Sequence, residues 1–150
     1  MSIRFSRMAR SSVSLLALAL TVSASAAEIG QVKISKGRVM IERAGRTEPA
    51  VVGTRLQVSD VVKTGADGSV GITMDDDSLL SAGPNSVVSL DRYVFDPTTR
   101  RGRFDASLNR GTLAVISGRI AKQAPDSMTL RTPTAILGVR GTEFVVSVDD

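Results

Sequence analysis

Apolar and polar residues alternate through most of the chain after residue 26, in short runs separated by turn-forming clusters. Successive side chains of a β-strand point to opposite faces, so this period of two predicts short strands with one buried face. No apolar pattern of helical spacing extends over the length of a helix in this part. The chain is therefore predicted to be all-β. The predicted buried positions are Val32, Ile34, Val39, Ile41, Val70, Ile72, Met74, Val88, Leu90, Phe104, Ala106, Leu108, Leu113, Val115, Met128 and Leu130.

Turn-forming residues separate the predicted strands. Ala44-Gly45-Arg46 is typical of a hairpin turn, and Asp67-Gly68 is a strong hairpin signal. A turn residue, a serine and an apolar residue recur near Ser69, Ser78 and Ser86, at spacings of 9 and 8 residues. That spacing suits successive hairpin arms of a sandwich and also half-turns of a short β-solenoid. The pattern alone leaves both architectures open.

The first 26 residues have the features of a secretory signal peptide. Three arginines precede an apolar core at 13–22, and Ala24-Ser25-Ala26 is a small-residue cleavage site. Ten apolar residues are too few to span a bilayer, which needs about 20, although an uncleaved anchor is the alternative. We therefore expect a signal peptide at 1–26, one domain at 27–150 and a periplasmic or secreted protein with no membrane span after cleavage.

The composition argues against a nucleic-acid partner and excludes disulfide bonds. Removal of the signal peptide leaves 124 residues, enough for one domain with its own core. The chain has 19 basic and 15 acidic residues, and three of its arginines lie in the signal peptide, so the domain carries a net charge of +1. We therefore expect no nucleic-acid partner. The chain has no cysteine, which excludes disulfides and a lipid-modified cysteine.

The sequence predicts neither an enzyme nor a metal protein. It lacks histidine and cysteine, and it contains no nucleophile elbow, zinc-protease motif or phosphate-binding loop. No catalytic residue and no cofactor are therefore predicted. Asp75-Asp76-Asp77 could meet Ca²⁺, but no calcium-loop spacing surrounds it. We interpret it as a solvated turn whose aspartates accept local backbone hydrogen bonds.

Arg100, Arg101 and Arg103 lie in a polar segment between Tyr93-Val94-Phe95 and Phe104. At a hairpin tip they would present three guanidinium groups, which suit carboxylate or phosphate partners. The segment is a candidate partner-contact loop, and an ordinary solvated loop is the alternative.

The segment from Arg131 to Asp150 contains the most specific motif of the chain. Its order T-P-T-A-I-x-G-V-R-G-T-x-F closely resembles the signature near the end of the FecR domain, a periplasmic all-β module. The signature residues are Thr132, Pro133, Thr134, Ala135, Gly138, Val139, Arg140, Gly141, Thr142 and Phe144. We expect these residues to be structural. For Arg140 we expect a guanidinium that bonds turn carbonyls, so that Arg140→Lys costs stability.

The resemblance extends in order from Glu28 to Val148. The segment from Gly53 to Gly65 is similar to the family's G-x-x-L-x-x-G-D-x-V-x-T-G pattern, except that Ser59 stands where the family usually has glycine. The segment at 108–113 resembles the strand before the final signature. For the fold, the resemblance implies a single compact β-solenoid-like roll, with a sandwich or jelly-roll-like packing as the alternative.

The best-known FecR proteins are transmembrane regulators that bind a receptor's signalling domain and control a sigma factor. This sequence shows no cytoplasmic segment and no spanning helix after the signal peptide. We therefore expect an exported, non-enzymatic domain that binds another envelope protein in a sensing, signalling or scaffolding role. The alternative is a structural or tethering module on an anionic cell-wall or outer-membrane polymer. The sequence also ends just after a strand, whose edge could accept a partner strand if the sequence is not a shortened one.

Overall fold

The computed structural model describes residues 25–140 and 143–149, so nearly all of the predicted signal peptide lies outside the described residues. The described part is dominated by strands, as the alternation predicts. The strands are β1 (Glu28–Lys36), β2 (Val39–Arg43), β3 (Arg46–Pro49), β4 (Arg55–Gln57), β5 (Val61–Thr64), β6 (Ser69–Met74), β7 (Leu79–Ala82), β8 (Val87–Phe95), β9 (Gly102–Ile116), β10 (Met128–Arg131), β11 (Ile136–Gly138) and β12 (Glu143–Val148). The helices are α1 (Arg119–Gln123) and a short 3₁₀ turn at Pro125–Ser127.

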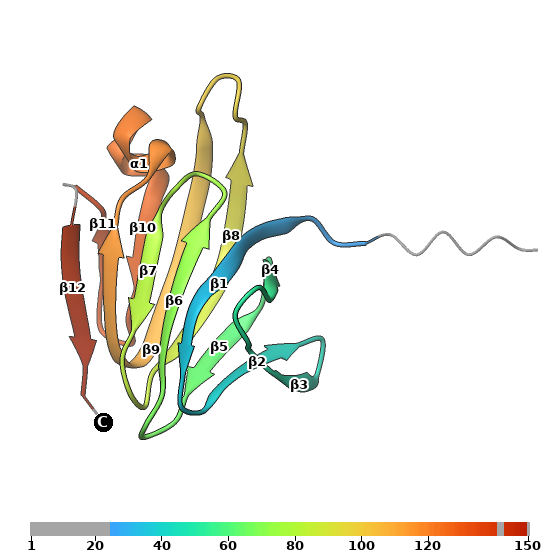
Figure 1. Cartoon of the computed structure of the whole chain (residues 1–150). Helices are drawn as coiled ribbons and strands as arrows, with labels where there is room; N and C mark the ends of the chain where they lie inside the picture. Colours follow the sequence, from blue (N-terminus) through green and yellow to red (C-terminus); the bar gives the residue numbers. More distant parts are fainter. Residues whose placement is uncertain (1–24, 141–142, 150) are drawn as a thin grey trace, which may run out of the picture.

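The strands form one curled sheet with two halves that lie one behind the other (Figure 1). We call the half with the order β4-β1-β6-β7-β9-β12 the front half. The half with the order β3-β2-β5-β8-β9-β10-β11 is the back half. All of these pairs are antiparallel except β9 with β10.

The strand β9 belongs to both halves. Its first part pairs with β8 and β10 in the back half, and from Gly111 onward it pairs with β7 and β12 in the front half. Gly111 has a φ of +88°, which side chains disfavour, and a Cβ there would lie 2.2 Å from Ser86 Oγ. A glycine is therefore needed where the strand passes from one half to the other.

The inner faces of the two halves share one hydrophobic core. Fifteen of the sixteen positions that the alternation predicts to be buried lie in it, and Ile34 is the exception. The core contains Phe104 and Leu108 from the first half of β9, and both side chains are fully buried. The all-β prediction is therefore confirmed. The solenoid prediction is not confirmed, because nearly all neighbouring strands run antiparallel.

Ile34 is exposed because a β-bulge interrupts the alternation of β1. The pairing of β1 with β6 shifts between Val32 and Ile34. Val32 stays fully buried, whereas Ile34 is 53% exposed on the opposite face. An extra residue in one strand reverses the faces of everything that follows it.

One of the two predicted hairpin turns joins strands that do not pair with each other. Ala44 and Gly45, both with positive φ, do form the hairpin turn between β2 and β3. Asp67-Gly68, however, connects β5 in the back half to β6 in the front half, and these strands do not pair. The hairpin prediction is wrong there, although a turn is present.

The acidic turn at 75–77 is not solvated throughout, because Asp76 is fully buried. Its Oδ2 accepts hydrogen bonds from Ser78 Oγ (2.8 Å) and the Ile120 backbone N–H (3.2 Å). Its Oδ1 accepts one from Tyr93 Oη (3.2 Å). Asp76 thus ties the β6–β7 turn to β8 and to the start of α1. The interpretation of this residue as a solvated aspartate was wrong.

Candidate partner-binding site

The first part of the C-terminal signature forms a tight turn between β10 and β11. Thr132 N–H donates to the Ala135 carbonyl (2.8 Å), and Ala135 N–H donates back to Thr132 Oγ1 (3.1 Å). Pro133, which fixes its own φ, and Thr134 occupy the centre of this turn. The turn brings β11 antiparallel to β10, with Leu130 opposite Leu137.

The later signature residues differ in exposure. Val139 is buried, and its N–H donates to the Met128 carbonyl (3.1 Å), while Phe144 packs against the core from β12. The Arg140 side chain is 82% exposed, and its Nη2 lies 3.7 Å from Asp126 Oδ1. The expected hydrogen bonds from Arg140 to turn carbonyls are not found among the described residues. Gly141 and Thr142 lie outside those residues.

The strand β12 has one paired side and one open side. It pairs with β9 from Glu143 opposite Ile116 to Val148 opposite Gly111. No other strand in the described part of the chain pairs with it. Half of its backbone N–H and C=O groups therefore point away from the sheet, and such an edge can accept an additional strand.

An apolar groove of about 270 Å³ accompanies this open edge. It lies where β11 of the back half and β12 of the front half meet at one side of the molecule (Figure 1). Leu137 and Val139 line it from one side, and Phe144 and Val146 from the other, with Arg140 also in its lining. A strand added to β12 could therefore place alternate side chains in an apolar groove.

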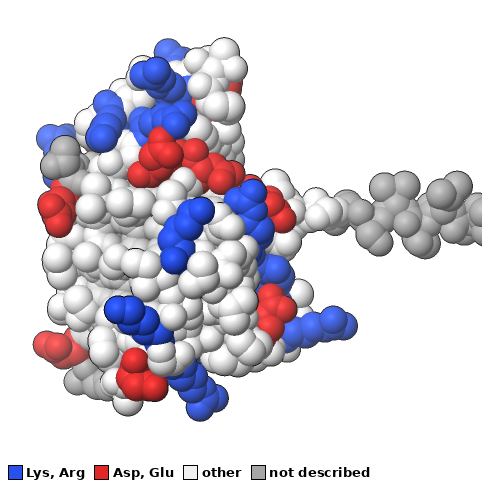
Figure 2. Space-filling view, viewed as in Figure 1, with Lys and Arg blue, Asp and Glu red and all other residues white. Residues whose placement is uncertain are grey.

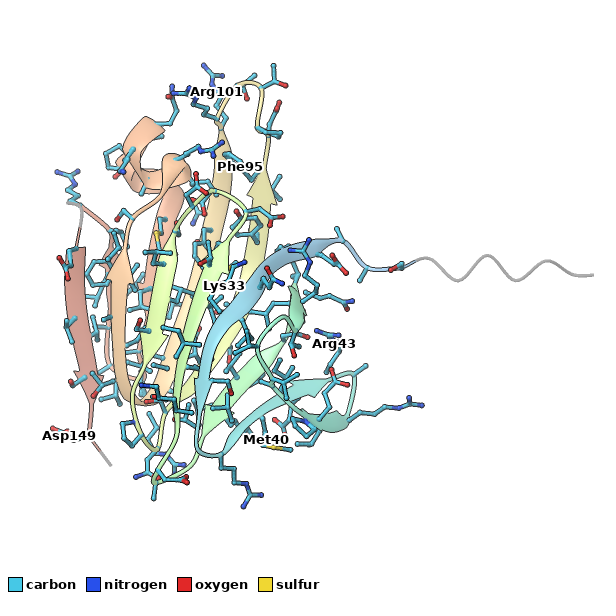
Figure 3. All side chains as sticks on the ribbon, in the orientation of Figure 1. Lys33, Met40, Arg43, Phe95, Arg101 and Asp149 are labelled. Carbon is cyan, nitrogen blue, oxygen red and sulfur yellow. The ribbon has the colours of Figure 1, made fainter. Side chains whose placement is uncertain are left out.

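The arginine segment forms the tip and one arm of the β8–β9 hairpin. Arg100 and Arg101 lie in the connection between β8 and β9, and Figure 3 shows Arg101 at the tip of the hairpin. Asp96 supports the loop, because its Oδ1 accepts the Thr98 N–H (2.9 Å) and its carbonyl accepts the Arg100 N–H (2.8 Å). The hydrogen bonds from the Thr98 and Thr99 backbone lower the pKa of Asp96. Neither arginine forms an ion pair within residues 25–140 and 143–149.

Arg103 does not belong to the presented loop. It lies in β9, and its Nε donates to both carboxylate oxygens of Asp105, at 3.1 and 3.0 Å. Partial burial raises the pKa of Asp105, but the hydrogen bonds from Arg103 and Thr129 outweigh this effect, so the pKa is lowered overall. Of the three arginines predicted for the loop, Arg100 and Arg101 therefore lie in it, whereas Arg103 lies in β9.

Sequence reasoning did not single out Leu137 or Val146 as parts of a site. Leu137 occupies the unspecified position of the signature, and Val146 follows an ordinary strand pattern. Only the meeting of β11 and β12 makes them neighbours across a groove.

The described residues contain no cluster of acidic side chains that could hold a metal ion. None of their helices has the length and apolar character that crossing a membrane requires.

Searches of curated proteins and of solved structures returned no significant match. The model of the FecR protein family matches residues 60–150, which contain β5 to β12 and the whole signature. This chain therefore belongs to the FecR protein family.

Proposed function

We propose that this chain is an exported, non-enzymatic FecR-domain module that binds another protein of the cell envelope, in a sensing, signalling or scaffolding role. The observation that carries the proposal is the open edge of β12 beside an apolar groove. In β-augmentation, backbone hydrogen bonds to the edge supply affinity, and pockets for alternate side chains supply specificity. Both elements are present at this side of the molecule.

The charges of β12 favour a partner strand from a different protein. Glu143 begins the strand and Asp149 follows it, and β12 contains no basic residue. Antiparallel pairing of two β12 strands would place Glu143 of one copy beside Asp149 of the other. Like charges at neighbouring cross-strand positions are destabilising. The edge therefore suits an extended segment with alternating apolar residues and with basic or neutral ends.

Site-specific crosslinking in cells tests this proposal. A photoreactive residue at Leu137 would lie in the groove, and one at Val52 would lie on an exposed turn far from it in the fold. We expect the Leu137 probe to capture one protein from the envelope fraction and the Val52 probe to capture none. Capture of the same proteins by both probes would contradict a specific edge site.

A pair of variants on β11 makes the test specific for the groove. Leu137→Lys places a charge in the apolar lining, whereas Ile136→Lys changes an exposed neighbour that does not line the groove. We expect Leu137→Lys to abolish capture by a probe at Ser147 and Ile136→Lys to preserve it. Equal capture by both variants would show that the groove is not used.

A second candidate function rests on the loop at 96–101. Arg100 and Arg101 are exposed and form no ion pair among the described residues, so they are available to an anionic envelope polymer. Binding through exposed charges weakens steeply as salt screens them, whereas a buried strand interface is much less sensitive. Retention on cell-wall material that falls with added salt and is lost in Arg100→Ser/Arg101→Ser would favour this tethering role over the edge.

A further inference from the structure

The outer face of the front half carries two rows of side chains that run across the strands. The first row, in pairing order, is Val145, Ala114, Ser81, Gly71 and Ile34. The second row is Glu143, Ile116, Leu79, Thr73 and Gln31, beyond which Arg55 of β4 pairs with Gln31 and forms an ion pair with Glu28 (3.0 Å). We call this surface the outer face. Of these ten residues only Glu143 is charged, and Figure 2 shows a wide, largely uncharged area over these strands.

Small side chains occupy the centre of the outer face, and large apolar side chains occupy its flanks. Ala114, Ser81 and Gly71 give the first row a centre of small residues. Val145, 63% exposed, and Ile34, 53% exposed, stand at the two ends of that row. Leu79 and Ile116 add further exposed apolar surface in the neighbouring row. Contiguous exposed apolar surface of this kind marks an interaction site on many proteins.

The charges at the borders of the outer face are separated by sign. Glu143 begins β12 and Asp149 follows it, whereas Lys33 and Lys36 lie in β1; Figure 3 labels Asp149 and Lys33. Lys33 Nζ donates to Gln31 Oε1 (2.6 Å), and none of the four residues forms an ion pair in the described part of the chain. By the registers, Glu143 lies level with Gln31, two residues before Lys33, while Lys36 pairs with Ser69 toward the other end of the strands, where Asp149 also lies.

We propose that the outer face binds a second copy of this chain, with a two-fold axis parallel to the strands between the two faces. This rotation places β12 of one copy over β1 of the other. It does not shift any residue along the strand direction, so residues at the same height in the two copies meet. Glu143 then lies about two residues along the strands from Lys33 of the other copy, within reach of the long lysine side chain, and Asp149 lies toward the same end as Lys36. Each contact occurs twice, as in every isologous interface.

The shape of the outer face suits the same arrangement. The sheet curls around its core, so its outer surface is convex and two such surfaces separate toward their flanks. Small residues at the centre permit close approach of the two sheets, which pack about 10 Å apart face to face. Val145 and Ile34 then fill the widening space at the flanks. A partner rich in one sign of charge would leave one border of the face unmatched.

The extent of the face indicates a weak dimer. Five strands about 4.8 Å apart and about six residues long cover roughly 400 Å² in projection, below the roughly 800 Å² that each partner buries in a typical stable interface. The dissociation constant is therefore expected between about 1 µM and 1 mM. This inference does not rest on the proposed function, because the outer face and the groove beside β12 share only Val145, and the substitutions that test each surface lie outside the other.

Sedimentation equilibrium of the purified full-length protein tests the proposal. We expect a monomer–dimer equilibrium in the wild type and a monomer for Ser81→Arg, whose long side chain would occupy the centre of the interface. Val52→Arg, at an exposed turn outside the face, is the matched control and should dimerise as the wild type does. A wild type that stays monomeric up to about 1 mM, or a dimer that persists in Ser81→Arg, would overturn the proposal.

A charge exchange tests the two-fold arrangement itself. Lys33→Glu/Lys36→Glu should raise the dissociation constant at least about tenfold, because all four of these pairs become repulsive. Adding Glu143→Lys/Asp149→Lys to that variant should restore dimerisation, since the sign pattern is then inverted on both borders. Failure of the exchange to restore the dimer would reject this geometry. Crosslinking at Leu137 tests the proposed partner strand separately, so either the dimer or the partner strand can be rejected without the other.

Discussion

Asp76 and Tyr93 are joined by two hydrogen bonds in the interior of the protein. The Asp76 backbone N–H donates to Tyr93 Oη (2.7 Å), and Tyr93 Oη donates to Asp76 Oδ1 (3.2 Å). Tyr93 also packs edge-on against Phe104, with ring centroids 5.3 Å apart. The phenol therefore sits in the core with both its donor and its acceptor used.

The buried pair predicts that the free energy of unfolding falls at alkaline pH. Burial raises the pKa of Tyr93, and the Asp76 carboxylate adds to the effect. In the unfolded chain the phenol ionises near pH 10. The contribution of Tyr93 is therefore fully present below about pH 10 and is lost as the pH rises above it, because only the unfolded state releases the proton.

The measurement is direct, because Tyr93 is the only tyrosine of the chain. Tyrosinate absorbance should appear only together with the loss of folded structure by circular dichroism. Tyr93→Phe should be less stable by about 1–3 kcal/mol at neutral pH and should lose this alkaline dependence. Ionisation of the phenol near pH 10 in the folded protein would contradict the buried placement.

Arg43 is predicted to be the most sensitive arginine for stability. Its Nε and Nη2 donate to the two carboxylate oxygens of Asp60 at 2.8 and 2.7 Å, and Asp60 is fully buried. Arg43→Ala would leave that carboxylate without its cation and should cost about 3 kcal/mol. Arg43→Lys should cost less, because a charge remains without the fork. Urea unfolding measures both, and Arg46→Ala, an exposed arginine in β3, is the control that should change little.

Ser59→Gly is predicted to stabilise the protein. Ser59 has a φ of +73°, a left-handed conformation that side chains disfavour by about 1–2 kcal/mol. Its N–H donates to the Leu90 carbonyl (2.7 Å), which holds that conformation in place. Glycine removes the strain but adds entropy to the unfolded chain, so the net gain should be about 0.5–1 kcal/mol. Thermal melting should show a higher Tm for Ser59→Gly and a lower one for Ser69→Gly, a strand position without positive φ.

Gly111→Ala is predicted to be severely destabilising. Its Cβ would lie 2.2 Å from Ser86 Oγ and 2.5 Å from Ser86 Cα, at a φ of +88°. Moving the backbone of the neighbouring strand should cost more than about 3 kcal/mol. Gly45→Ala is the matched control, because Gly45 also has positive φ but no atom lies within 4 Å of the added Cβ. Equal losses for the two variants would show that conformation alone, and not the contact with Ser86, limits residue 111.

Strand positions could be predicted from the sequence because alternation is a local property. Val70, Ile72 and Met74 all lie in the core, as their spacing indicated. The same rule failed at Ile34, where one bulged residue reversed the faces. Alternation also could not place Arg103, because β9 begins at Gly102, two residues before its first apolar residue.

Strand partners could not be predicted, because they depend on residues distant in sequence. Asp67-Gly68 specifies a reversal of the chain, but whether the flanking strands pair or separate into different halves is decided by the strands beside them. Asp76 was misjudged for the same reason. Its partners Tyr93 and Ile120 lie 17 and 44 residues further along the chain.

The sharing of β9 between the two halves has a consequence for the order of folding. Before β9 is available, β7 and β8 each end their half of the sheet with an unpaired edge. The early strands therefore cannot reach their final arrangement until residue 116 has been synthesised, however fast the local turns form. Closure of such distant pairings is slow compared with hairpin formation. The nascent chain thus remains incompletely folded over most of its synthesis, which is the condition that a chain needs if it is to be threaded through a narrow translocation channel.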